Sequence, residues 1–228
     1  MTASIEPNVF STKSDTAYAE VRRRILSGDL QPGSVLAQYE LAESMRMSIT
    51  PLREALRRLR GEGLIELDVH KETRVAPLNH EEAQELVEVR IALEPAAAEL
   101  AAHRRTDSDI VEIRGAAERL VPVTRDRGEQ GLIAHSAFHR AIYRASHNSH
   151  MIALLDALWD KSDRYRRMGL MLPPGAGDRE RDYQEHLTMV EMVVARDADG
   201  LRSLMRQHIS LSLTVSAIEA LERPDSVG

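Results

Sequence analysis

Four histidines in the C-terminal half of the chain could bind a metal ion. His135 and His139 are four residues apart in a stretch that we expect to be helical, so their imidazoles project from one face of that helix. His186 and His208 occur singly on two later predicted helices. Neutral imidazole is a common ligand of divalent transition metals, and four such groups inside a helical bundle would suit zinc, nickel or cobalt. Spacing alone leaves the alternative open that these are surface histidines, or histidines satisfied within a core.

A second group of residues could bind an anionic polymer. Residues 46–60 contain five arginines against the single acid Glu54, a local excess of four positive charges in a chain whose net charge is −6. Residues 1–78 carry 11 basic and 11 acidic side chains, so residues 79–228 account for the whole negative charge. This distribution predicts that the N-terminal part contacts nucleic acid. The alternative interpretation is a solvated helix face with some pairing to Glu54.

The composition excludes several other classes of protein. At 228 residues the chain is long enough for two domains. It has no cysteine, which rules out a disulfide scaffold, a thiolate metal site and a cysteine nucleophile. No stretch approaches the roughly 18 apolar residues of a membrane span, and the first residues lack the pattern of a signal peptide. We therefore expect a cytoplasmic protein without a membrane partner.

The arginine cluster falls on the third of three predicted helices. Apolar spacing predicts the first two helices near 15–27 and 38–45. Thr50 is expected to cap the third helix through its hydroxyl, with Pro51 in the first turn, where its missing N–H costs nothing. Gly61 is expected to end this helix. The second and third helices would then be joined by only a few residues.

The arginines of the third helix share one face. Arg53, Arg57 and Arg60 occupy positions i, i+4 and i+7, opposite the apolar stripe. Two short β-prone runs follow, "LIELD" and "TRVAPL", and predict a hairpin whose tip carries His70 and Lys71. Three helices followed by a hairpin form a winged helix-turn-helix, in which the third helix reads base edges. Arginines on that face would contact phosphates and guanine.

The remainder of the chain is predicted to be helical, beginning with a helix that Asn79 caps. The absence of strand patterns in this half indicates an antiparallel helical bundle, so the fold class is mainly α. The predicted domains are a winged helix-turn-helix at 15–78 and a bundle at 79–220, with flexible ends at 1–14 and 221–228. The expected helices of the bundle are 80–104, 107–126, 129–146, 149–172, 176–196 and 197–220.

The segment "ILSGDLQPGSVLAQYELAESMRMSITPLREALRRLRGEGLIEL" resembles the DNA-binding domain of GntR-family bacterial transcription regulators. The family pattern S-R-T-P-v-R-E-A-L-x-x-L corresponds to "SITPLREALRRL" here, with Ile49 in place of the usual arginine. The resemblance implies that double-stranded DNA is a partner and that a homodimer binds a palindromic operator. The residues that the resemblance and the predicted wing place against DNA are Tyr39, Ser48, Thr50, Arg53, Arg57, His70 and Lys71.

The second half resembles the FCD effector domain found in the same family, and its six predicted helices place it nearer to the vanillate-type subgroup. "HSAFHRAIYRASHNSHM" is similar to the family pattern D-x-x-F-H-x-x-l. The resemblance implies a metal ion bound by His135, His139, His186 and His208. The usual first ligand of the family is an aspartate, which is replaced here by His135. A fourth neutral imidazole favours a borderline ion such as zinc or nickel over magnesium or calcium.

The resemblance also implies an effector. Arg90 matches an arginine in the first helix of the FCD domain, and a guanidinium near a cation would bind the carboxylate of a small organic acid. The alternative is that Arg90 pairs with Glu94, one helical turn later. We expect three further arginines to be solvated or to lie at an interface: Arg164, Arg166 and Arg167.

Three functions are compatible with these features. The first is a DNA-binding transcription regulator, a repressor by family tendency, whose DNA affinity responds to a small carboxylate at the metal. The second is a dedicated metal sensor, in which the ion itself is the signal. The third is a metal-dependent enzyme, but the chain has no H-E-x-x-H motif, and Glu185 and His186 would point roughly 100 degrees apart on a helix. We predict a regulator and not an enzyme.

Overall fold

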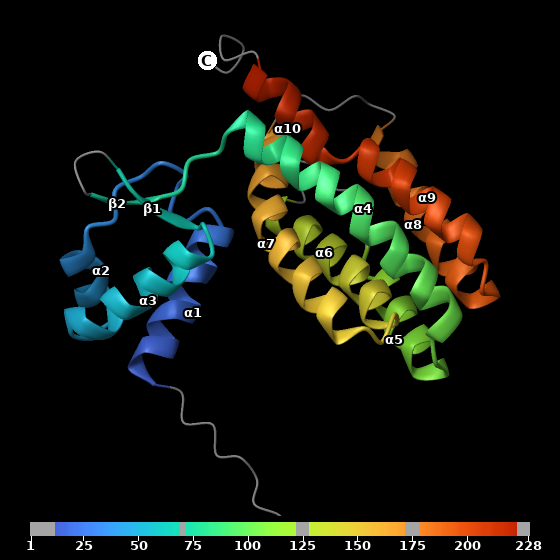
Figure 1. Cartoon of the computed structure of the whole chain (residues 1–228), viewed down its shortest axis with the longest axis horizontal. Coiled ribbons are helices and arrows are strands. Elements are labelled where there is room, and N and C mark those ends of the chain that lie inside the picture. Colours follow the sequence, from blue (N-terminus) through green and yellow to red (C-terminus); the bar gives the residue numbers. More distant parts are fainter. Residues whose placement is uncertain (1–11, 69–71, 122–127, 172–177, 223–228) are drawn as a thin grey trace, which may run out of the picture. The chain divides into compact units, whose positions relative to one another are not determined.

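The computed structural model describes residues 12–68, 72–121, 128–171 and 178–222, and these are mainly helical, as predicted. The chain divides into two compact units, Met1–Pro77 and Leu78–Gly228. Figure 1 labels the helices and strands of both units. No described helix is both long and apolar enough to cross a membrane.

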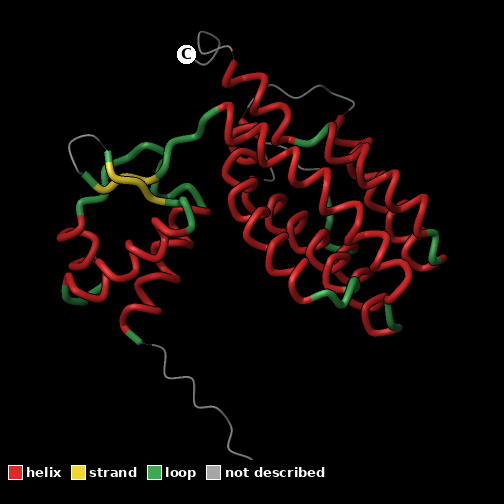
Figure 2. The backbone as a smooth tube through the Cα atoms, viewed as in Figure 1, coloured by secondary structure: helices red, strands yellow, loops and turns green. Residues whose placement is uncertain are grey.

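The N-terminal unit contains three helices followed by a two-stranded antiparallel hairpin, as predicted (Figure 2). A capping box between Thr12 and Asp15 fixes the start of the first helix. In the hairpin, Ile65 pairs with Val75. The helices bury an apolar cluster that includes Leu52 and Leu59, and this cluster holds the third helix in place. The elements are α1 (Lys13–Leu26), α2 (Gln38–Ser44), α3 (Ile49–Gly61), β1 (Ile65–Leu67) and β2 (Thr73–Val75).

The start of α3 differs from the prediction. Ser48, and not Thr50, occupies the N-cap position, with an extended backbone (φ −73°, ψ 161°), and the helix begins at Ile49. Thr50 is therefore the second helical residue, where its side chain is exposed and has no capping role. The helix ends at Gly61 as predicted, and Gly63 then adopts a φ of +74°, a left-handed conformation that glycine tolerates, before β1.

The C-terminal unit is helical throughout its described residues. The side chain of Asn79 accepts a 2.7 Å hydrogen bond from the backbone N–H of Glu82, so the predicted cap of α4 is confirmed. The helix predicted at 107–126 is shorter in the structure and ends at Ala117. The elements are α4 (His80–Arg104), α5 (Asp107–Ala117), α6 (Gly128–Arg144), α7 (Ser149–Met171), α8 (Asp178–Ala195), α9 (Ala198–Ser210) and α10 (Leu213–Glu222).

The described part of this unit has seven helices, and the prediction of six was wrong. The expected helix 197–220 is broken at Leu211, where α9 is capped. The backbone carbonyl of Ser212 then accepts hydrogen bonds from the N–H groups of Val215 and Ser216, at 3.0 and 3.3 Å, and so starts α10. Serine favours such a helix start, whereas the apolar spacing continues across the break and conceals it.

The helices of the C-terminal unit surround one core. Helix α4 lies along α9, and it also contacts α7, α10 and α6 (Figure 1). Its buried face is rich in alanine, so neighbouring helices can approach it closely. The large side chains of this core come from α6, α7 and α9, and they surround the region where the histidines lie: Phe138, Tyr143, Trp159 and Met205.

Candidate metal centre and nucleic-acid interface

The structure brings the four predicted histidines together inside the C-terminal unit. Helix α6 supplies His135 and His139, α8 supplies His186, and α9 supplies His208. All four side chains are buried, and the most exposed of them, His135, keeps only 5% of its surface accessible. Each can offer one ring nitrogen, and the four nitrogens lie within 4.8 Å of one another. We call this group the histidine ring.

The spacing within the histidine ring fits a transition-metal ion. Nε2 of His139 and Nε2 of His186 are 3.0 Å apart. Two nitrogens bound to one tetrahedral zinc ion at about 2.05 Å would be about 3.3 Å apart. The helices therefore already hold these two ligands at almost the separation that an ion requires.

Burial keeps three of the four imidazoles in the neutral form that binds metal. Desolvation lowers the pKa of His135, His139 and His186 well below the ordinary value, because the charged form loses its hydration inside the core. The nearby guanidinium of Arg166 adds to this effect at all three, because it repels a further positive charge. A neutral imidazole has a free lone pair for a cation, so the ring is prepared for a ligand role.

A hydrogen-bonded chain links His139 to helix α4. The hydroxyl of Tyr143 lies 3.1 Å from Nδ1 of His139 and donates a 2.5 Å hydrogen bond to Oε2 of Glu94. Glu94 also accepts from Nε of Arg90 at 2.5 Å. A histidine that binds metal through one nitrogen commonly uses its other nitrogen in such an outer contact, which orients the ring. The chain Arg90–Glu94–Tyr143 supplies that contact.

Arg90, the predicted effector ligand, is buried and forms an ion pair. Its side chain is 1% exposed, pairs with Glu94 through two nitrogens and donates to Thr214 at 3.3 Å. Its guanidinium lies 4.8 Å from the ring centroid of Trp159. The pairing with Glu94 that we considered as the alternative is therefore present, and the guanidinium also lies inside the unit that holds the histidine ring.

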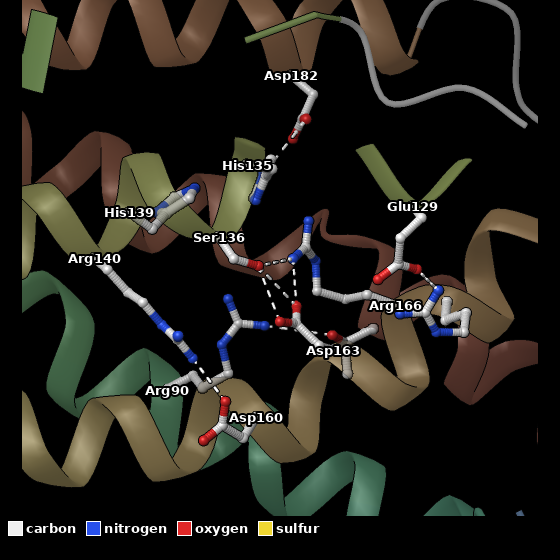
Figure 3. A network of polar contacts seen from close by, with 12 residues as sticks. Arg90, Glu129, His135, Ser136, His139, Arg140, Asp160, Asp163, Arg166 and Asp182 are labelled. Atoms are coloured by element: carbon white, nitrogen blue, oxygen red, sulfur yellow. Dashed lines mark hydrogen bonds and ion pairs between the residues drawn. The ribbon is translucent and has the colours of Figure 1, made fainter. Parts of the chain in front are cut away.

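Two further buried arginines were missed by the sequence analysis. Arg166 on α7 is 2% exposed, and Arg164 is 5% exposed, so the expectation of solvated or interfacial positions was wrong for both. Nη1 of Arg166 donates to Asp163 at 2.7 Å and to Ser136 at 3.3 Å (Figure 3). Its guanidinium also lies 5.0 Å from the Trp159 ring. The spacing of Asp163 and Arg166 is compatible with an ion pair on one helix face, but it does not show that this face is buried, which depends on how α6 packs against α7.

Two carboxylates of α8 were also missed as neighbours of the ring. Oε2 of Glu185 lies 2.8 Å from Nδ1 of His208, and Asp182 lies 3.5 Å from the same nitrogen. Asp182 also approaches Nε2 of His135 at 3.9 Å (Figure 3). The spacing D-x-x-E-H could have suggested them, since residues 182 and 186 share a helix face.

The candidate nucleic-acid interface is the outer face of α3. Arg53, Arg57 and Arg60 are exposed, and together with α2 and the hairpin they line a hollow of about 310 Å³. None of the three forms an ion pair with another residue that the structure describes. Arg58, in contrast, points to α1, where it pairs with Asp15 at 2.8 Å.

The other predicted DNA contacts are distributed around this face. Ser48 and Thr50 are exposed at the start of α3, and Tyr39 on α2 is 73% exposed. The two wing residues, His70 and Lys71, lie outside the described residues. The described part of the predicted face is therefore accessible to a large ligand.

Comparison with protein families assigns both units. Residues 13–75 match the model described as "Bacterial regulatory proteins, gntR family", and residues 85–211, more than half of the chain, match the FCD domain. The chain belongs to the GntR family. Its C-terminal unit is an FCD domain, so this part of the prediction is confirmed, whereas the six-helix count on which the placement near the vanillate-type subgroup rested is not met.

Relatives within the GntR family are named as transcription regulators. The chain is 28% identical over 198 residues to the HTH-type transcriptional repressor GlaR of Escherichia coli K12, covering 84% of this chain and 90% of that protein. It is 34% identical over 160 residues to the Glc operon transcriptional activator of the same strain, covering 61% of this chain and 63% of that protein's length. The prediction of a transcription regulator and not an enzyme is confirmed.

A similar fold has been observed experimentally in another protein. The solved structure of E. coli McbR/YncC superimposes with a TM-score of 0.75, covering 94% of this chain and 99% of that chain, at 23% identity. The winged helix-turn-helix followed by a helical domain is therefore the architecture of a known regulator structure.

Proposed function

We propose that this GntR-family regulator binds a palindromic DNA operator as a homodimer and represses transcription. We further propose that a small organic acid, bound beside a metal ion in the FCD domain, changes the affinity for DNA. The observation that carries the proposal is the buried ring of four imidazoles within a chain that also presents an accessible arginine face on a helix-turn-helix.

The proposal of DNA binding rests on the different positions of the arginines of α3. Arg58 is used within the unit, whereas Arg53, Arg57 and Arg60 are exposed on the outer face. A helix of this kind fits the major groove, where arginine can contact guanine through two hydrogen bonds. In a homodimer, two such helices would meet half-sites about one helical turn apart.

The metal part rests on the chemistry of the histidine ring. His135, His139, His186 and His208 would hold a borderline divalent ion such as zinc or nickel, because all four ligands are nitrogen. When bound, the ion would supply a positive charge that attracts an effector carboxylate placed beside it. The chain itself supplies four buried imidazoles in a site from which bulk water is excluded.

The effector part rests on Arg90. To bind a carboxylate, its guanidinium would have to release part of its contact with Glu94, which is hydrogen-bonded to Tyr143 next to His139. Effector binding at Arg90 would therefore change the surroundings of a metal ligand, and the two sites would be coupled. A shift between two arrangements of the homodimer would transmit this change to the DNA-binding units.

A dedicated metal sensor is the second candidate. It is favoured by one observation, which is that the four ligand atoms converge without any group from outside the chain. In this case metal alone would change DNA affinity. In the first case the change would require metal and an organic acid together.

The decisive experiment begins with the metal content of the purified protein, measured by plasma mass spectrometry. Thermal shifts with a panel of small carboxylic acids are then recorded before and after chelation. About one ion per chain, with a stabilisation by acid that disappears on chelation, is the expected result. Protein without metal, and without binding of added zinc or nickel, would disprove the metal part.

DNA binding is measured on the same samples. Operators are selected from a random duplex library, and the dissociation constant is measured with apo protein, with metal, and with metal and acid. If the selected sequence is palindromic and its affinity changes only when metal and acid are both present, the effector-responsive regulator is supported. If metal alone changes the affinity, the metal sensor is supported. A promoter reporter then distinguishes repression from activation, since the relatives include one named repressor and one named activator.

A further inference from the structure

The histidine ring carries no negative charge of its own. Four neutral imidazoles leave the two positive charges of a divalent ion uncompensated, in a buried region that also contains Arg90 and Arg166. Each arginine already has a carboxylate partner, Glu94 for Arg90 and Asp163 for Arg166. A buried charge without compensation is costly, so an ion in the ring needs further negative groups nearby.

Two carboxylates on α8 are placed to supply this charge. Oε2 of Glu185 accepts a 2.8 Å hydrogen bond from Nδ1 of His208, and Oδ1 of Asp182 lies 3.5 Å from the same nitrogen. Both side chains are mostly buried, with 11% and 20% of their surface exposed. We call them the acidic pair.

The contact with Glu185 fixes which nitrogen of His208 can bind metal. An ionised carboxylate can only accept a hydrogen bond, so Nδ1 of His208 carries the hydrogen and Nε2 keeps its lone pair. The other oxygen of Glu185 lies 3.6 Å from Arg181, a half-exposed side chain on the outer surface. One carboxylate thus joins the surface to a candidate metal ligand.

Asp182 faces His135 at a longer distance, which is too long for a hydrogen bond. Its Oδ2 is 3.9 Å from Nε2 of His135, at ion-pair distance, while Nδ1 of His135 is buried and has no hydrogen-bond partner among the described residues. If Nε2 carries the hydrogen that faces Asp182, Nδ1 is the nitrogen left free to bind an ion. Asp182 therefore faces two of the four imidazoles, His135 and His208.

We propose that Asp182 and Glu185 are positioning residues of the metal site. This inference rests on the proposed metal binding at the histidine ring. The acidic pair lies outside the four ligands and offsets the two charges of the ion. Glu185 orients His208 through its outer nitrogen, and Asp182 acts on His135 and His208 through its charge. It supplies from α8 the negative charge that His135, an imidazole in the position of the family's aspartate, does not provide.

The test compares single variants of the full chain. Zinc affinity is measured by competition with a chromophoric chelator for the unaltered protein, Glu185→Gln and Asp182→Asn. Loss of an outer carboxylate commonly weakens metal binding about 10-fold to 100-fold, and that is the expected result for Glu185→Gln, with a loss in the same direction for Asp182→Asn. Glu191→Gln, which removes the same charge from an exposed position of α8, is the control and should bind zinc unchanged.

Cobalt spectra distinguish an outer role from direct ligation. The visible bands of Co²⁺ report the ligand set, so they should keep their energies in both variants while the affinity falls. Unchanged affinity in both variants would overturn the proposal, and so would a changed set of bands, because the carboxylate would then be a ligand itself. If the unaltered protein binds neither ion, the proposed metal function fails instead. Circular dichroism of the metal-free variants tests whether they remain folded. If Glu185→Gln does not fold, Asp182→Asn, at the more exposed position, provides the test.

Discussion

The hydroxyl of Tyr143 donates a hydrogen bond to Oε2 of Glu94 over 2.5 Å, and this contact joins α6 to α4 in the core of the FCD domain. Burial and the neighbouring carboxylate raise the pKa of Tyr143 well above its ordinary value, so the phenol keeps its proton. Since the hydroxyl hydrogen is used in the hydrogen bond to Glu94, only an oxygen lone pair of Tyr143 remains for Nδ1 of His139, 3.1 Å away. Nδ1 must therefore carry the hydrogen, and Nε2 is free to bind metal.

Tyr143→Phe should weaken metal binding. The substitution removes the acceptor that orients His139, and the expected loss of zinc affinity is about 10-fold to 100-fold. It also removes one donor to the buried Glu94, so the free energy of unfolding should fall by about 1 to 3 kcal/mol. Chelator competition and urea unfolding measure the two effects. Tyr183→Phe on α8 is the control, and equal zinc affinity in Tyr143→Phe and the unaltered protein would contradict the assigned role.

His139→Ala should abolish stoichiometric metal binding and leave the helical content intact. The imidazole is fully buried and is one of the four candidate ligands. The metal content should fall from about one ion per chain to none, as measured by plasma mass spectrometry, with circular dichroism as the check on folding. His150→Ala removes an exposed histidine of α7 and should retain the ion. Retained metal in His139→Ala would refute the ligand assignment.

The histidine ring shows how far the sequence could predict the site. Local spacing places His135 and His139 on one helix face, because four residues make about one turn. Their meeting with His186 and His208 depends on how α6, α8 and α9 pack, and spacing does not contain that information. The resemblance to the FCD domain carried this step of the prediction, and the structure brings the same four residues together.

The arginines show where sequence reasoning fails. Arg166 lies in a charged stretch that is typical of a solvated helix face, yet Asp163, Ser136 and Trp159 surround it in the core. Its charge partner Asp163 lies one turn away on the same helix, but the burial of this face of α7 depends on how other helices, such as α6 with Ser136, pack against it, and spacing does not contain that information. The break between α9 and α10 was missed for a different reason, since apolar spacing persists through Ser212 while the hydrogen bonding changes.

The metal-free protein should lose stability as the pH falls below about 6.5. His135, His139 and His186 have pKa values well below 6.5 in the folded chain, because burial disfavours their charged forms. Between the folded and unfolded pKa values the unfolded chain binds more protons, so its free energy is lowered by acid and stability falls. Above about pH 6.5 this contribution to stability is complete.

Thermal unfolding of chelated protein between pH 5 and 8 measures this effect. The unfolding temperature should decline on the acid side of this range, and the decline should be smaller in a variant that lacks one of these imidazoles, His186→Gln. Excess zinc should oppose the decline, because bound metal competes with protons for the same nitrogens. A flat profile for the chelated protein would contradict the neutral, buried state of the ring.

Arg53→Ala should weaken operator binding and relax its sequence preference. Arg53 is exposed on α3 and lines the hollow between this helix and the hairpin, where it is free to contact a base edge. An arginine that contacts guanine contributes about 1 to 3 kcal/mol of discrimination between bases. The dissociation constant for the selected operator should therefore rise by the factor that corresponds to this free energy, while binding to unrelated duplex should change less. Fluorescence anisotropy at fixed salt measures both, since phosphate contacts depend strongly on ionic strength. Arg144→Ala, which removes an exposed arginine from the FCD domain, is the control for net charge. Equal losses for operator and unrelated DNA would assign Arg53 to the phosphate backbone, and no loss for either would remove it from the interface.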